Sequence, residues 1–149
     1  MQTFLPLASF ETSARILDNQ RLGKQRVEGL QIFNALTLNK QSRWRNHPAT
    51  LMWKGYEPML VNYIRAICDE WTSRGYKDTV KEKVRLMAKE HGLSETEIKY
   101  ADKPWWLNKR QFHASHRSNL IRKMPERYGK LWPDHEEDLD YWWPVRIKK

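Results

Sequence analysis

The stretch from Glu57 to Arg74 constrains the fold most, because its apolar residues recur at intervals of three and four. That spacing places them on one face of an α-helix, where they can pack on a core. Pro58 suits the first turn of such a helix, and Gly75 stands where helices commonly end. We therefore predict a core helix over residues 57–74. Its apolar stripe comprises Leu60, Tyr63, Ile64, Ile67, Cys68 and Trp71.

The rest of the chain also favours helices, because no segment shows the alternating apolar pattern of a half-buried strand. The expected elements are an extended segment over 1–9, a helix over 10–38 that could break near Gly23, a connector over 39–46, a helix over 79–91, a short helix opened by the capping box at 94–97, a loop over 102–108, a helix over 111–123 and a tail from 125 to 149. The predicted class is all-α. At 149 residues the chain has the length of one compact helical domain, with an extended N-terminal segment and an aromatic-rich tail that wraps the bundle.

The charge of the chain indicates which class of binding partner it favours. Lysine and arginine number 27 against 18 acidic residues, which gives a formal charge of +9. Such an excess favours a polyanion, because neutralising phosphates releases condensed counterions. No apolar run is long enough for a membrane span and no export leader is evident, so we expect a cytoplasmic protein without a membrane partner. The lone Cys68 suits a reducing compartment, and the eight tryptophans fit either a core or base stacking.

Residues 17–29 carry an uneven distribution of polar side chains. At 100° per residue, Arg21, Lys24, Gln25 and Glu28 share about a third of the helix circumference. Two cations, an amide and a carboxylate on one face resemble a binding site. The alternative is a solvated face with a Lys24–Glu28 ion pair. Arg26 lies nearly opposite Lys24, so it could contact DNA or form an internal pair.

Several familiar chemistries lack their motifs. The chain has no Gly-rich phosphate loop and no Cys-x-x-Cys pair, and we expect neither a metal nor another cofactor. His113 and His116 have the i,i+3 spacing of metal ligands, yet no carboxylate or thiol partners are evident nearby. With Arg117 they suit phosphate contacts at the start of a helix, and the alternative is a hydrated helix start.

A second group of hydrogen-bond donors and aromatic residues lies near the middle of the chain. Asn46 and His47 precede Pro48, and Trp53 and Tyr56 flank a lysine and a glycine. The aromatic rings could stack on an unpaired base. Core packing of Trp53 is the alternative. These four residues are candidate DNA contacts.

The order of several motifs resembles the pyrimidine-dimer DNA glycosylase/endonuclease V family, and more closely its bacterial and phage branch. The resemblance covers nearly all of the chain and is specific through the combination of motifs rather than through any one of them. The motifs are MQTFLP at 1–6, LDNQRLGKQRVEGLQI at 17–32, NHPATLMWKGYEP at 46–58, FHASHRSNLIRKMP at 112–125 and YGKLWP at 128–133. The weaker similarity to the phage prototype also includes Arg74-Gly75-Tyr76.

The resemblance implies a metal-free, all-α DNA-repair enzyme. In the prototype the N-terminal α-amine attacks sugar C1′ of a damaged pyrimidine nucleotide, the base leaves, and an imine forms with the opened sugar. β-Elimination then nicks the strand. A carboxylate on the first helix supports the sugar chemistry, and cations hold phosphates while a nucleotide is extruded.

The chain departs from the prototype at two places. The second residue is Gln2, whose bulk disfavours removal of Met1, so we expect the Met1 amine to react, or that of Gln2 after trimming. Ungapped alignment places Gly23 at the catalytic glutamate. Glu28 or Asp18 could supply the carboxylate, and Glu28 is preferred because it shares the cationic face. Lys24 is the alternative nucleophile.

These arguments predict a cofactor-independent DNA glycosylase with abasic-site lyase activity on damaged or modified pyrimidines. The expected partner is double-stranded DNA that carries such a base, bound by a monomer in the nucleoid of a bacterial or phage-infected cell. The predicted DNA contacts are Arg21, Gln25, Arg26, Asn46, His47, Trp53, Tyr56, His113, His116 and Arg117. The alternative functions are a non-catalytic module that binds distorted DNA and a phage–host protein-interaction factor.

Overall fold

The core of the protein is built around one long helix, α4. The computed structural model describes residues 1–135 and 137–145. Helix α4 packs against four neighbours, and the five helices are α1 (Phe10–Ile16), α2 (Asn19–Leu36), α4 (Glu57–Ser73), α5 (Val80–Glu90) and α6 (Glu95–Lys99). Leu60, Ile64 and Ile67 of α4 are fully buried, as the periodicity predicts. The predicted core helix is therefore confirmed. Gly75 follows it with a φ of +93°, a conformation that favours glycine.

The first predicted helix divides into α1 and α2, and the break lies at Leu17 and Asp18 rather than near Gly23. Both residues have extended backbone, with ψ of 139° and 159°. The Asp18 side chain accepts a hydrogen bond from the Arg21 N–H and so caps α2. Leu17 is fully buried, which holds the corner against the core. Gly23 lies within α2, and the Trp71 ring is 3.1 Å from where its Cβ would lie, so a larger residue would crowd that ring.

Three further helices complete the regular structure of the described residues. They are α3 (Pro48–Leu51), α7 (Arg110–Lys123) and α8 (Pro125–Leu131). The capping box predicted at the start of α6 is present, with Ser94 and Glu97 bonding each other's backbone N–H groups. The sequence predicts a Pro-punctuated tail from residue 125, and helix α8 corrects that prediction. Proline instead occupies the first turn of α8, where its missing N–H costs no helical hydrogen bond.

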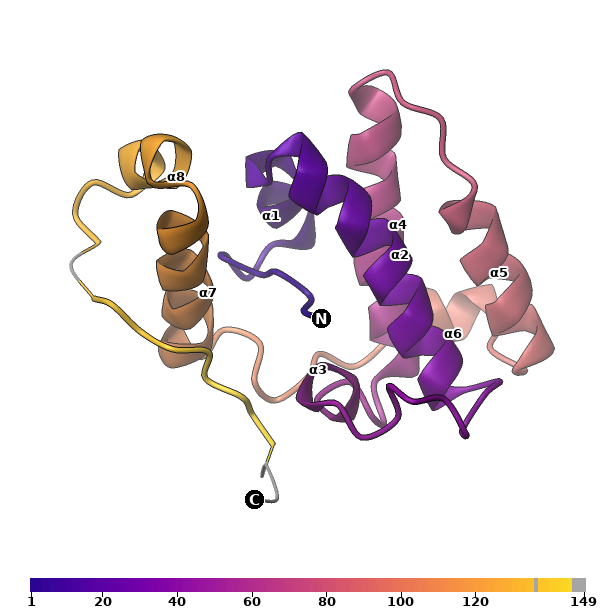
Figure 1. Ribbon diagram of the computed structural model, residues 1–149. Helices are drawn as coiled ribbons and strands as arrows, with labels where there is room; N and C mark the ends of the chain where they lie inside the picture. The colour runs from indigo at the N-terminus through magenta and orange to yellow at the C-terminus, as the bar shows by residue number, and fades with distance from the viewer. Residues whose placement is uncertain (136, 146–149) are drawn as a thin grey trace.

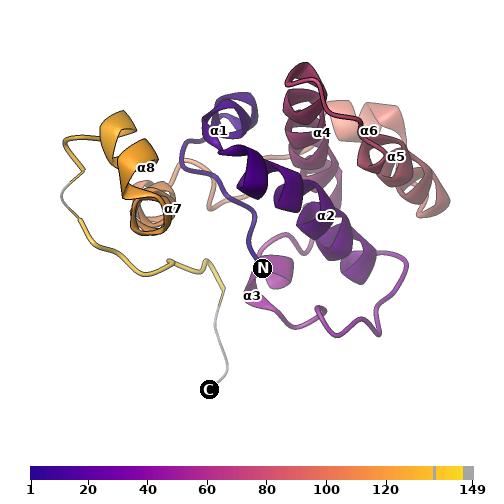
Figure 2. The same cartoon turned by 45° about the horizontal axis from the view of Figure 1, so that its top comes forward.

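The elements form two groups joined by α1 and α2. Figures 1 and 2 show α7 and α8 on one side, α4, α5 and α6 on the other, and the N-terminal segment beside α2 in the middle. The tail runs from α8 past α7 towards α3 (Figure 1). Its aromatic residues pack on the core, as expected of a wrapping tail, and those with partly buried rings are Tyr141, Trp142 and Trp143.

All regular structure in the described residues is helical, which confirms the all-α class. One hydrophobic cluster joins Phe4 near the N-terminus to Tyr128 of α8. Trp53 and Trp106 are its largest fully buried side chains. Over the described ranges, no helix combines the length and apolar character needed to cross a bilayer.

Candidate functional site

The extended N-terminal segment, residues 1–7, takes its hydrogen-bond partners from side chains. Extended chain outside a sheet has no backbone partners, so its buried N–H and C=O groups need others. Gln25 of α2 supplies two of them, since its Oε1 accepts from the Phe4 N–H and its Nε2 donates to the Gln2 carbonyl, both at 2.8 Å. The Tyr63 hydroxyl lies 2.9 Å from the Phe4 carbonyl and 2.8 Å from Gln25 Oε1. We predicted a DNA contact for Gln25; the structure instead gives its buried amide these internal partners.

Helix α7 holds the next part of the segment with two histidines and an arginine. His116 Nδ1 accepts from the Leu5 N–H at 2.9 Å, and His113 Nδ1 lies 2.8 Å from the Leu5 carbonyl. Arg117 Nη1 donates to the Pro6 carbonyl at 2.7 Å. We predicted phosphate contacts for all three residues, but both imidazoles are buried and bind backbone. Their i,i+3 spacing reflects two contacts to the backbone of one residue, Leu5.

The tautomers of the two histidines follow from their partners. His113 Nε2 accepts from the Asn108 N–H at 3.0 Å, so its proton is on Nδ1 and is donated to Leu5. His116 uses Nδ1 as an acceptor, so its proton is on Nε2. Burial lowers the pKa of His113 and lowers that of His116 to about 3, with neighbouring positive charge acting in the same direction. Both rings are therefore neutral at physiological pH.

Trp53 is part of this internal support rather than a surface for base stacking. It is fully buried, and its Nε1 donates to the Thr3 hydroxyl at 3.0 Å. Tyr56 is half-buried, with its hydroxyl 3.4 Å from the Trp105 N–H. Asn46 is exposed, and His47 caps α3 through the Ala49 N–H. Of the four candidate contacts in this region, the core-packing alternative therefore holds for Trp53.

A cavity of about 250 Å³ opens beside the chain terminus, between α2, α7 and the tail. It brings together the whole polar face predicted on the first long helix, as well as the N-terminal residues. Sequence reasoning missed its contributions from α7 and the tail, because no local pattern singles out a helix-terminal lysine or one tyrosine among many aromatics. The lining residues are Met1, Gln2, Phe4, Gln20, Arg21, Lys24, Gln25, Glu28, Lys123 and Tyr141.

Glu28 is the carboxylate of this cavity. Its Oε2 accepts from Gln25 Nε2 at 3.0 Å and lies 3.4 Å from the Gln2 backbone nitrogen. Burial raises the pKa of Tyr63, and the negative charge of Glu28 adds to that effect. Within the described residues no ion pair joins Glu28 to Lys24, so the solvated-pair alternative does not hold.

Asp18 lies outside the cavity lining and has structural partners. The Tyr128 hydroxyl donates to its Oδ1 at 2.5 Å, and Arg21 Nη1 lies 3.1 Å from the same oxygen. Burial by itself would raise the pKa of Asp18, but the hydrogen bonds from Tyr128 and Arg21 and the charge of Arg21 lower it. Asp18 therefore stays ionised as the cap of α2.

The cations predicted on the first long helix separate into two kinds. Arg21 and Lys24 line the cavity. Arg26 points elsewhere, with its Nε 2.7 Å from Asp78 Oδ1 and its guanidinium 4.9 Å from the centre of the Trp71 ring. The internal-pair alternative for Arg26 is therefore the one that the structure bears out.

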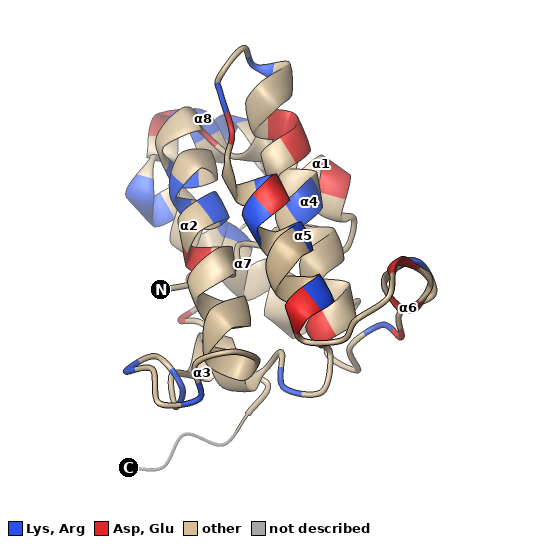
Figure 3. Ribbon diagram, turned by 90° about the vertical axis from the view of Figure 1, so that its right-hand side faces the viewer, with Lys and Arg blue, Asp and Glu red and all other residues tan. Residues whose placement is uncertain are grey.

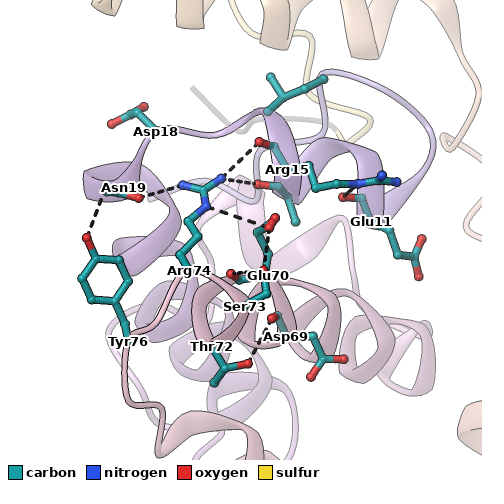
Figure 4. A network of polar contacts seen from close by, with 12 residues as sticks. Glu11, Arg15, Asp18, Asn19, Asp69, Glu70, Thr72, Ser73, Arg74 and Tyr76 are labelled. Atoms are coloured by element: carbon teal, nitrogen blue, oxygen red, sulfur yellow. Dashed lines mark hydrogen bonds and ion pairs between the residues drawn. The ribbon is translucent and has the colours of Figure 1, made fainter.

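The corner between α1 and α2 is fixed by Arg74 at the end of α4. Figure 4 shows its guanidinium reaching Asn19 Oδ1 at 2.9 Å and the Ala14 and Arg15 carbonyls at 3.2 and 3.1 Å. Asn19 Nδ2 in turn donates to the Tyr76 hydroxyl at 3.2 Å. The Arg74-Gly75-Tyr76 motif thus sets the start of α2, the helix that carries Glu28.

Two cationic regions flank the chain terminus. Figure 3 shows the N-terminus at one edge of the molecule, with lysines and arginines of α2 above it and those of the loop between α2 and α3 below it. His47 lies at the end of that loop. Burial lowers its pKa, and the positive charge of the N-terminal amine lowers it further. No group of three or more metal-binding side chains is found in the described residues.

Comparison with known proteins connects this geometry to a family. A family model described as pyrimidine dimer DNA glycosylase matches residues 1–84, more than half of the chain. No curated protein and no solved structure matches the chain. The matched part includes the N-terminal segment, Gln25, Glu28 and all of α4, whereas α7 and the tail lie outside it. The chain belongs to the pyrimidine dimer DNA glycosylase family of DNA-repair enzymes.

Proposed function

We propose that this protein removes a damaged or modified pyrimidine from duplex DNA and then nicks the strand, through an imine between its terminal amine and the sugar. The observation that carries the proposal is the shared cavity of the first residue and Glu28, with Glu28 Oε2 only 3.4 Å from the Gln2 nitrogen. That nitrogen is the amide next to the Met1 amine, so a terminal amine and a carboxylate that line one cavity can act on one sugar carbon.

The chemistry assigns one role to each group. The neutral amine attacks C1′, its nitrogen bonds to that carbon, and the bond from C1′ to the base breaks. Glu28 accepts the proton that the nitrogen sheds and stabilises the positive charge that develops on the sugar. The expelled base takes a proton from water. The proton held by Glu28 passes to the ring oxygen as the ring opens, which gives a protonated imine. Loss of a proton from C2′ then expels the 3′ oxygen and nicks the strand.

The reacting amine belongs to Met1, or to Gln2 if Met1 is removed. The hydrogen bonds from Gln25, Tyr63 and the α7 histidines favour this assignment, because they hold the segment in place before substrate binds. Lys24 is the alternative nucleophile, since it lines the same cavity. Asp18 is the alternative carboxylate, although its partners are Tyr128 and Arg21.

The cations around the cavity are suited to hold DNA. Arg21, Lys24 and Lys123 line it, so phosphates beside an extruded nucleotide would meet positive charge on two helices. We propose that a monomer acts on each lesion.

Borohydride reduction tests the proposal. With lesion-bearing or abasic duplex, reduction of the imine links the protein covalently to DNA, and peptide mapping identifies the nitrogen. We expect the label on the N-terminal peptide. Label on the Lys24 peptide would identify Lys24 as the nucleophile in place of the terminal amine. Binding without any adduct on either substrate contradicts the enzyme proposal and leaves a non-catalytic module that binds distorted DNA.

A further inference from the structure

The loop between α2 and α3, residues 37–47, carries positive charge that the cavity does not use. From Gly29 to Tyr56 the chain has no aspartate or glutamate. The cations in the same stretch are Lys40, Arg43, Arg45 and Lys54. All four are exposed. A run of 28 residues with four cations and no carboxylate creates a local positive potential.

These four cations have no acidic partners among the residues that the structure describes. In the described part of the chain, none of them lies within 4.0 Å of a carboxylate oxygen. On the opposite group of helices several cations are paired, as in Arg65–Glu95, Lys81–Asp69 and Arg85–Glu82. The positive charge of this stretch is therefore not neutralised by carboxylates of the described residues, and an anionic partner can neutralise it.

The loop holds its two guanidiniums in defined places. Arg43 stacks on the Trp44 ring, with its guanidinium carbon 4.8 Å from the ring centre. Arg45 Nη1 donates to the carbonyls of Gln41 and Ser42 at 3.3 and 3.0 Å. A side chain that is already ordered loses less conformational entropy when it binds a phosphate. A guanidinium also keeps several N–H groups for that purpose.

Aromatic contacts fasten the loop next to the cavity. The Trp44 and His47 rings pack edge to face, with their centres 6.0 Å apart. The His47 ring packs in the same way on Trp143 of the tail, with the ring centres 5.9 Å apart. Trp143 contacts Tyr141 at 5.5 Å, and Tyr141 lines the cavity. The loop and the cavity are thus parts of one packed surface.

A second hollow of about 350 Å³ lies at the base of the loop, and Lys40, Arg45 and Lys54 line it together with Asn46. Glu57 is the one carboxylate in its lining, and that side chain accepts a hydrogen bond from the Gly55 N–H at 3.1 Å. Three cations against one partly engaged carboxylate favour an anionic occupant. Backbone phosphate fits this chemistry.

The arrangement of charges points to a long partner rather than to a single ion. Figure 3 places the loop and the cations of α2 along the same edge, with the chain terminus between them. A duplex whose damaged nucleotide enters the cavity would extend past both regions. We infer that the α2–α3 loop, together with Lys54 just after α3, is a second DNA contact, which binds the phosphate backbone on one flank of the lesion through Lys40, Arg43, Arg45 and Lys54. This inference rests on the proposed function, because it takes the cavity as the place of the lesion.

The salt dependence of binding to a short undamaged duplex tests the loop. Arg43→Gln/Arg45→Gln should lower the slope of log affinity against log salt by about 1.8, because each phosphate contact contributes about 0.9. Lys40→Gln/Lys54→Gln should give a similar decrease without removing any hydrogen bond of the loop. The matched control is Lys81→Gln/Arg85→Gln on α5, which removes the same charge from paired residues and should leave the slope unchanged. Melting temperatures verify that each variant is folded.

Duplexes trimmed on either side of the lesion give an independent measurement. Wild-type affinity should fall about tenfold when one flank is removed, and the loop variants should not respond to that removal. Slopes equal to that of the α5 control in both loop variants overturn the inference. The undamaged duplex keeps this test separate from the test of the enzyme proposal. If borohydride trapping fails, the slopes of the loop variants can still be compared with that of the α5 control. If trapping succeeds and the slopes of the loop variants are unchanged, only the loop inference is rejected.

Discussion

Acid should loosen the N-terminal segment through His116, and the structure gives the size of the effect. His116 is fully buried, and its Nδ1 must stay unprotonated to accept the Leu5 N–H. This burial, against the rings of Phe4 and Tyr141, disfavours the protonated form, and the positive charge of Arg117 opposes protonation further. The pKa of His116 is about 3 in the folded protein, against an ordinary value of 6.5.

The sign follows from proton linkage. The unfolded chain binds a proton on His116 below pH 6.5, whereas the folded protein does not until about pH 3, so acid favours unfolding over that window. Each pH unit corresponds to about 1.4 kcal/mol. Between pH 6.5 and pH 5 the free energy of unfolding should therefore fall by about 2 kcal/mol from His116 alone. His113, whose pKa is also lowered by burial, adds a change of the same sign.

Urea unfolding at pH 7, 6 and 5, followed by tryptophan fluorescence, measures this loss. Asp18 and Asp78 do not obscure it, because their lowered pKa values place their titration below this range. His116→Asn offers a neutral oxygen to the Leu5 N–H, so it should retain much of the stability and lose most of the pH dependence. His91→Asn, at an exposed position, is the matched control. An equal pH dependence in wild type and His116→Asn would refute the reasoning.

Three further predictions concern the cavity and its support. Glu28→Gln should lower single-turnover excision by about 100-fold while DNA affinity and melting temperature stay near wild type; unchanged excision would remove Glu28 from the chemistry. Gln25→Leu leaves the Phe4 N–H and the Gln2 carbonyl without their partners, so urea unfolding should report a loss of about 2–6 kcal/mol; a loss below 1 kcal/mol would show that other groups replace the amide. Gly29→Ala places a Cβ 2.8 Å from Ile64 Cγ1 and should destabilise the protein by about 1–3 kcal/mol in thermal unfolding, whereas Gly129→Ala, with nothing within 4 Å, should not destabilise it.

Sequence alone predicted what depends on local spacing. The apolar stripe of α4 and the capping box of α6 follow from neighbours within one or two turns, and both are present. The polar face of α2 also depends only on local spacing, because helical geometry places Arg21, Lys24 and Glu28 on one side. All three line one cavity.

Sequence could not reveal which polar residues the interior would use. His113 and His116 look like surface donors because nothing near them in the chain shows that Leu5, more than a hundred residues away, needs two partners. The break before α2 had a local signal in Asp18, a strong N-cap, but a helical pattern on both sides concealed it. Tyr141 reaches the cavity only through the path of the tail.

The contacts of Leu5 also determine when this site can exist. The bond between Leu5 and His116 spans 111 positions, and closing a loop of that length costs about 4 kcal/mol beyond a constant. During synthesis the N-terminal segment is made first, and its backbone N–H and C=O groups gain their α7 partners only after α7 has been made. A fragment that ends near residue 84 would contain Glu28 and Gln25 yet leave the carbonyls of Leu5 and Pro6 without partners. The segment that carries the terminal amine would then have its full set of hydrogen-bond partners only in a chain that has been made through α7.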